Sequence, residues 1–165
     1  PEKNKWFNHS HIQKTENDVF SSVIKEKFRE AHKKYNNQQT SKIIDLVKPR
    51  LETINDLFKV CEFFYVDPVV FSEKSLKKFK NVNSIEILSS IAVLFEDKEG
   101  QENLKENLKA LSKEKDWGFG KVLGLLRISV VGDLSGPDLF EIISLVGGET
   151  CVKRISSLIS FLEKK

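Results

Sequence analysis

The stretch that decides the fold is residues 117–162, WGFGKVLGLLRISVVGDLSGPDLFEIISLVGGETCVKRISSLISFL. Its apolar residues recur at helical spacing in three runs, which are separated at Gly132, at Gly136-Pro137 and at Gly147-Gly148. Glycine readily ends a helix in a left-handed conformation, and proline suits the first turn of a new one. The stretch therefore predicts three consecutive helices, and it puts Arg127 near a junction between two of them.

The same helical spacing continues through most of the chain. Apolar stripes run through residues 19–31, 85–95 and 104–111, and Asp18 and Asn83 stand where capping residues of the first two are expected. No pattern of strand, turn and strand competes with them. We predict an all-α chain with two packed helical subdomains, residues 1–97 and 98–165, divided at a polar turn near residues 97–102.

Residues 36–71 interrupt this regularity. Asn36–Gln39 is expected to end one helix, and Thr40 or Ser41 to cap the next, shorter one. Pro49 lacks an N–H group, so it breaks the pattern and is predicted to open a further helix, with Arg50 in its first turn. The apolar run 63–71 is interpreted as a buried connection rather than a short strand.

The charge of the chain is small but unevenly distributed. The net charge is only +3, yet residues 1–80 hold 16 Lys and Arg against 11 Asp and Glu, whereas residues 81–165 hold 11 against 13. Lys74, Lys77 and Lys78 form a local basic cluster. Such a cluster is either a solvated face or a surface that contacts phosphates, and we take these lysines as candidates for phosphate contact.

The cysteine usage fits a cytosolic protein. Cys61 and Cys151 lie far apart without a CxxC neighbour, which favours reduced thiols in a core over a disulfide. No apolar run approaches the roughly 20 residues that cross a bilayer. The sequence contains no methionine, so we interpret it as part of a longer protein whose missing part lies upstream.

Catalytic chemistry is hard to assemble from these residues. His9 and His11 are two residues apart, which on a helix puts them on different faces, so they make no metal clamp. No Gly-x-Ser-x-Gly elbow is present, and Gly118–Lys121 lacks the spacing of a phosphate-binding loop. We predict no catalytic residue, metal or cofactor in this chain. A helical protein-interaction module without RNA binding stays open as an alternative, and a standalone enzyme is disfavoured.

Three segments resemble one known family. Lys5–Asn8, Lys48–Thr53 and Trp117–Ile155 are similar to the C-terminal anticodon-binding region of bacterial-type glutamyl-tRNA synthetases, which are class I enzymes. There, a helix ending in Arg precedes a short turn, a Gly-Pro-x-Leu-Phe helix start and a helix closed by Gly. The resemblance implies a helical cage that binds the anticodon of tRNA(Glu). It also implies a cytoplasmic, monomeric glutamate–tRNA ligase with an ATP-binding catalytic domain upstream.

The resemblance implies roles for individual residues. Arg50 matches an arginine that contacts the third anticodon base, whereas Arg127, Gly136 and Leu139 match positions around the first two bases. Lys109 matches a basic residue on the preceding helix, although some family members have Arg there and Thr in place of Gly136. A planar arginine fork suits recognition of a base edge. The helix start at Leu139 is expected to expose backbone N–H groups, and its side chain to offer an apolar shelf.

Overall fold

The structure is a computed structural model that describes residues 9–79, 83–96 and 98–164. Within these ranges the chain forms α-helices and 3₁₀-helices joined by turns, without a strand, which confirms the all-α prediction. None of the described helices combines the length and apolar character that a bilayer crossing requires. The segment Lys5–Asn8 lies outside the described residues.

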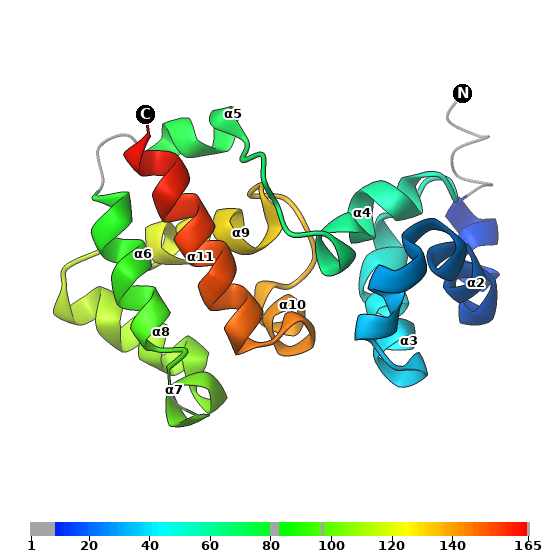
Figure 1. Cartoon of the computed structure of the whole chain (residues 1–165), viewed down its shortest axis with the longest axis horizontal. Coiled ribbons are helices and arrows are strands. Elements are labelled where there is room, and N and C mark those ends of the chain that lie inside the picture. Colours follow the sequence, from blue (N-terminus) through cyan, green and yellow to red (C-terminus); the bar gives the residue numbers. More distant parts are fainter. Residues whose placement is uncertain (1–8, 80–82, 97, 165) are drawn as a thin grey trace. The chain divides into compact units, whose positions relative to one another are not determined.

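The chain divides into two compact units, Pro1–Val66 and Asp67–Lys165 (Figure 1). The predicted boundary at residue 97 is wrong, because α6 (Ser84–Val93) packs against α9 (Phe119–Val131) and α11 (Gly148–Glu163) within the second unit. The polar turn that follows α6 is thus a connection inside that unit. Helical periodicity locates the ends of helices, but it does not tell which helices share a core.

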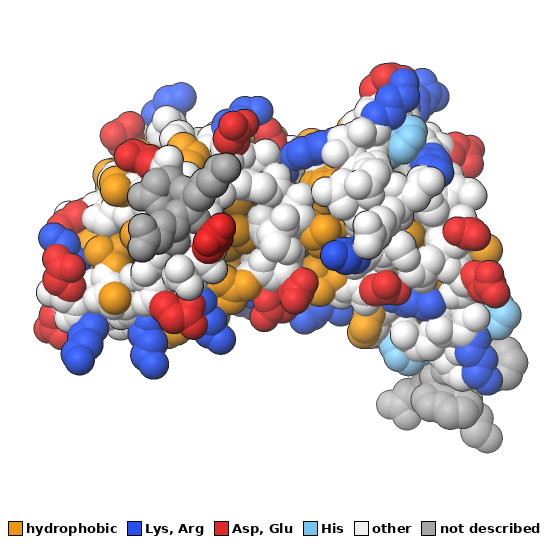
Figure 2. All heavy atoms as spheres, turned by 90° about the horizontal axis from the view of Figure 1, so that it is seen from below, with side chains coloured by type: hydrophobic (Ala, Val, Ile, Leu, Met, Phe, Trp, Pro, Cys, Tyr) orange, Lys and Arg blue, Asp and Glu red, His pale blue; other side chains and the backbone are white. Residues whose placement is uncertain are grey.

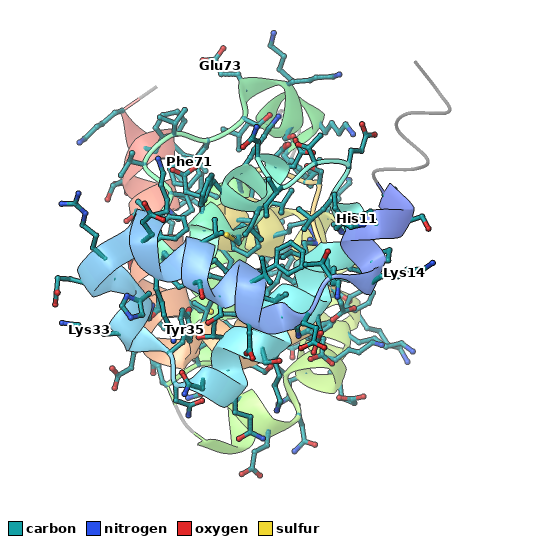
Figure 3. The ribbon with its side chains drawn as sticks, turned by 90° about the vertical axis from the view of Figure 1, so that its right-hand side faces the viewer. His11, Lys14, Lys33, Tyr35, Phe71 and Glu73 are labelled. Carbon is teal, nitrogen blue, oxygen red and sulfur yellow. The ribbon has the colours of Figure 1, made fainter. Side chains whose placement is uncertain are left out.

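The first unit is built around three α-helices. Fully buried apolar side chains, among them Phe20, Ile43 and Leu57, join α2 to α3 and α4. Tyr35 lies within this unit and donates from its hydroxyl to the carbonyl of Phe64 at 3.0 Å, whereas Lys33 points outward (Figure 3). In chain order the elements are α2 (Asn17–Phe28), η1 (Arg29–Lys34), α3 (Asn37–Val47), η2 (Lys48–Arg50) and α4 (Asp56–Tyr65).

Helix starts in the first unit differ from the predicted ones. Asn36 caps α3 with a reciprocal capping box, because its side chain accepts from Gln39 N while the Gln39 side chain accepts from Asn36 N. The polar run thus begins a helix rather than ending one, and Thr40 is a buried residue of α3. Asp18 lies inside the first turn of α2, whose N-cap is Glu16. Pro49 opens no α-helix: it lies in the short η2.

The second unit has α11 and α9 at its centre. α11 packs on α6, α9 and α10, and α9 also packs on α8. The glycines at 132 and 147, with φ of 92° and 88°, end α9 and α10, as the sequence predicts. The other elements are α5 (Glu73–Leu76), η3 (Lys77–Phe79), α6, α7 (Lys98–Glu102), α8 (Leu104–Glu114) and α10 (Leu139–Val146).

The segment between the last helix of the first unit and α5 is only partly buried. Phe63 and Phe64 are buried within α4, and Phe71 is buried too, but Val69 and Val70 are 81% and 79% exposed. The prediction of a buried connection is therefore wrong for the middle of the run. Apolar sequence alone does not distinguish a core segment from an exposed one.

A buried arginine fastens the start of the second unit. Arg154 of α11 is 1% exposed and donates from Nε to Asp67 Oδ1 at 2.8 Å and from Nη1 to the carbonyl of Val130 at 2.7 Å. Lys153 bonds the other carboxylate oxygen of Asp67 at 2.7 Å. Burial by itself raises the pKa of Asp67, but the bonds from Lys153 and Arg154 outweigh it and lower the pKa.

Each unit contains one cysteine, and both side chains are buried. Cys61 lies in α4 and Cys151 in α11. Burial raises the pKa of the Cys61 thiol to about 12. At neutral pH this group is therefore a protonated, apolar part of the core.

Candidate nucleic-acid interface

Arg127 and Gly136 meet at the junction between α9 and α10. Arg127 is half-buried and donates from Nη1 to the carbonyl of Pro137 at 2.8 Å, which ties the end of α9 to the start of α10. Gly136 has φ of 144°, and a Cβ at this position would lie 3.2 Å from the same Nη1. Glycine is thus favoured here by the backbone conformation, which other residues rarely adopt, and by the close approach of the guanidinium. The junction predicted from the sequence is present.

The start of α10 is less open than expected. Asp138 caps this helix, because its Oδ1 accepts from the N–H groups of Phe140 at 2.9 Å and Glu141 at 3.0 Å. Two backbone donors at this helix start are therefore already used. Leu139 is only 4% exposed and belongs to the core. In this conformation its side chain offers no apolar shelf, so that part of the prediction is wrong.

The basic helix α5 is fastened to the same loop. The N–H of Ser72 donates to the carbonyl of Gly132 at 2.9 Å. The hydroxyl of Ser75 donates to Asp133, and this bond lowers the pKa of the Asp133 carboxyl. The structure therefore brings the lysines of α5 and η3 to the neighbourhood of the α9–α10 junction. Lys74, Lys77 and Lys78 are all exposed.

Arg50 lies in the first unit, at the corner formed by η2 and Leu51, and hydrogen bonds hold the residues on both sides of it. The carbonyl of Lys48 accepts from the Gln13 side chain at 2.9 Å, and that of Leu51 lies 2.9 Å from His9 Nδ1. Leu51 is fully buried, whereas Arg50 is exposed. The corner thus projects the arginine into solvent from a fixed backbone.

Another bond fixes the residues after this corner. The N–H of Thr53 donates to Asp56 Oδ2 at 2.7 Å, and this bond lowers the pKa of Asp56. Sequence reasoning missed the parts played by His9 and Gln13. The sequence pattern suggests no role for His9 beyond metal binding, and no periodicity predicts that a polar side chain will bond a carbonyl about 40 residues away.

The remaining candidates lie on ordinary helical surface. Lys109 is an exposed residue of α8. Figure 2 shows one face of the molecule, on which basic and acidic side chains are interspersed rather than segregated. Charge on this face therefore identifies no binding surface by itself, whereas Arg127 and Arg50 each stand at a position with defined geometry.

Comparison with known proteins identifies the family. Residues 19–159 match the family model described as anticodon binding domain. The glutamate–tRNA ligase of Christiangramia forsetii is 34% identical over 169 residues, covering 99% of this chain and 33% of its own length. That of Flavobacterium psychrophilum is 30% identical, covering 98% and 32%. The chain thus spans about a third of the length of these relatives.

A solved structure agrees with this assignment. The crystal structure of a glutamate–tRNA ligase from Elizabethkingia meningosepticum, in complex with its amino acid, matches with a TM-score of 0.82 and 30% identity. The match covers 96% of this chain and 32% of that one. Because the family model covers most of the residues and the helices superpose as well, the chain belongs to the anticodon binding domain family.

Proposed function

We propose that this chain is the anticodon-recognition part of a glutamate–tRNA ligase, an enzyme that attaches glutamate to tRNA(Glu) with ATP. The observation that carries the proposal is the α9–α10 junction, where Arg127 is anchored on Pro137 beside Gly136, in a chain similar over 99% of its length to such a ligase. ATP and glutamate would bind to a catalytic domain upstream. The chain described here would contribute recognition and no turnover, in a cytoplasmic monomer.

The geometry suits the reading of unpaired bases. Proteins that recognise RNA sequence mostly target loops, where base edges and faces are accessible. The bond from Arg127 to Pro137 fixes one nitrogen of a planar guanidinium, and this orients the fork before any base arrives. At Arg50 the braced part is the backbone on either side of the residue, which fixes the point from which the exposed side chain projects. A side chain that is already oriented loses less conformational entropy when it binds.

Arg50→Gln is expected to reduce discrimination at the third anticodon base. A bidentate contact of arginine with a base distinguishes bases by about 1–3 kcal/mol, so the preference for the cognate loop should fall roughly 5- to 150-fold. The measurement is binding of this chain to two anticodon stem-loops, one of the glutamate type and one altered at the third base.

Arg29→Gln is the matched control, because it removes the same charge from another exposed site of the first unit. Its preference should equal that of the wild type. An unchanged preference in the Arg50 variant would contradict the role of Arg50. Absence of binding to either stem-loop by the wild type would favour the protein-interaction alternative.

Lys78→Ala should weaken the binding of both stem-loops alike. Lysines that contact phosphates add affinity that does not depend on sequence. Removing one such lysine reduces the slope of log K against log salt by about one. The measurement is a salt titration of the wild type and the variant. Lys113→Ala on α8 serves as control, and equal slopes for all three proteins would refute the phosphate role.

A further inference from the structure

A groove on the second unit is not accounted for by the anticodon site. It has a volume of about 660 Å³ and follows an exposed stripe of α11. Lys153, Ser156 and Ser160 of α11 form this stripe together with Lys164 just after the helix, and Val69 also lines the groove. The spacings of three and four residues keep these side chains on one helical face. At 1.5 Å per residue, the two lysines are about 16 Å apart along the helix axis.

The floor of the groove is firm and apolar. Phe71 and Phe161 pack edge to face with ring centroids 5.2 Å apart, and Phe71 is buried. Phe71 comes just before α5, where Glu73 points outward (Figure 3). Val69 is mostly exposed, so its side chain offers apolar surface to an occupant that has both apolar and polar groups. The rim along α11 carries the ammonium and hydroxyl groups.

The groove connects two parts of the candidate nucleic-acid interface. At one end, a Cβ on Gly132 would lie 3.4 Å from Pro68 Cβ, so the groove begins beside the end of the helix that carries Arg127. At the other end, Phe161 contacts Phe71, which leads into α5 and its lysines. A strand lying in the groove would thus run from the α9–α10 junction toward Lys74.

The chemistry of the rim fits a sugar–phosphate backbone. Protein contacts to nucleic-acid backbones come largely from lysine, serine and backbone N–H groups, and they bind phosphate and sugar oxygens. None of the described residues that line the groove is acidic, although Asp67 bonds Lys153 at 2.7 Å and offsets part of its charge. Lys164 at the other end therefore contributes most to the attraction of an anion.

We propose that this groove binds the sugar–phosphate backbone of the tRNA strand that leaves the anticodon loop. The inference rests on the proposed function, because it takes the occupant to be the RNA whose anticodon is read at the neighbouring junction. The lysine and serine side chains bind phosphate oxygens and ribose hydroxyls, and the apolar wall packs against the sugars. This contact adds affinity that does not depend on the anticodon.

The test compares Lys164→Gln and Ser160→Glu with the wild type in binding to a full tRNA(Glu) transcript and to one altered in the anticodon. Each phosphate contact contributes about 0.7–0.9 to the slope of log K against log salt. A variant that lacks one contact should therefore bind about five- to eightfold more weakly than the wild type at 0.1 M salt, which is one decade below 1 M. The salt slope should fall by the same 0.7–0.9, and Ser160→Glu should weaken binding at least as much. The ratio between the two transcripts should not change.

Lys113→Gln and Ser89→Glu are the matched controls, since they make the same changes on exposed positions of α8 and α6. Unchanged affinity and salt slope in both groove variants, with anticodon preference intact in the wild type, would overturn the groove and leave the proposed function standing. Loss of affinity in the groove variants of a protein without anticodon preference would show that the groove binds an RNA backbone, but it would refute the proposed function and with it the anticodon strand as the occupant. No binding of either transcript by the wild type would overturn both. Circular dichroism checks that each variant is folded.

Discussion

Asp67→Ala is expected to lower the free energy of unfolding of the second unit by about 3 kcal/mol. The change removes the carboxylate that faces the guanidinium of Arg154, which is 1% exposed, and a buried charge deprived of its partner is strongly destabilising. The value lies at the lower end of the usual range because Arg154 also bonds the carbonyl of Val130. Hydrogen exchange of the amides of α9 and α11 measures the loss.

The reverse substitution should cost less. Arg154→Leu leaves Asp67 with its bond to Lys153 at a side chain that is 35% exposed, so no carboxylate is stranded in the core. We expect a loss of about 1–3 kcal/mol, mainly for the unsatisfied Val130 carbonyl. The double variant should be less destabilised than the sum of the two single changes. Additive effects would show that the pair is not energetically coupled.

The same pair also makes stability depend on pH. The pKa of Asp67 is lower in the folded than in the unfolded chain, so its contribution is present above the unfolded pKa, near 3.8. It is lost as the pH falls through the lowered, folded pKa. Asp67→Asn should remove this part of the acid sensitivity, whereas an unaltered acid profile would mean that other carboxylates dominate.

Gly124→Ala should destabilise the second unit by about 2 kcal/mol, because an added methyl group overfills a packed site. A Cβ on Gly124 would lie 2.6 Å from Cζ of Phe79 and 3.4 Å from a methyl carbon of Leu134. The ring of Phe79 is itself buried, so it has little room to withdraw. Thermal unfolding followed by circular dichroism measures the change.

Gly120→Ala is a control on the same helix. Nothing lies within 4 Å of the position its Cβ would take, and the residue is exposed. Alanine restricts the unfolded chain and favours the helix, so this variant should gain about 0.5–1 kcal/mol. If alanine destabilises the protein at Gly124 and stabilises it at Gly120, four residues away, the close packing of η3 on α9 is supported. Stability changes of the same sign at both positions would contradict this packing.

The parts of the fold that sequence predicts well are those with a local physical cause. Gly132 and Gly147 end their helices because each adopts a positive φ. Glycine adopts such a conformation more easily than other residues, so the residue type alone predicts these helix ends. Asn83 likewise caps α6 by accepting from Glu86 N at 3.2 Å. The junction of Arg127 with Gly136 follows from the same short stretch of chain.

The errors concern interactions between distant residues. The placement of α6 in the second unit depends on its packing against helices more than 25 positions later, which its own pattern does not encode. Leu139 is apolar at a helix start, a description that fits a core residue as well as a contact surface. The support of the Arg50 corner by His9 joins residues 42 positions apart. Such contacts depend on tertiary packing and leave no mark on periodicity.

The two buried cysteines provide a separate intrinsic reporter for each unit. Thiolate is the form that reacts with disulfide reagents, so a thiol in either core reacts only after its surroundings open. Cys61 reports on opening of the first unit and Cys151 on opening of the second. Timed alkylation followed by peptide mass spectrometry would therefore give two opening rates from one sample without any introduced label. Under oxidative stress, the same relation limits damage at each thiol to the rate at which its own unit unfolds.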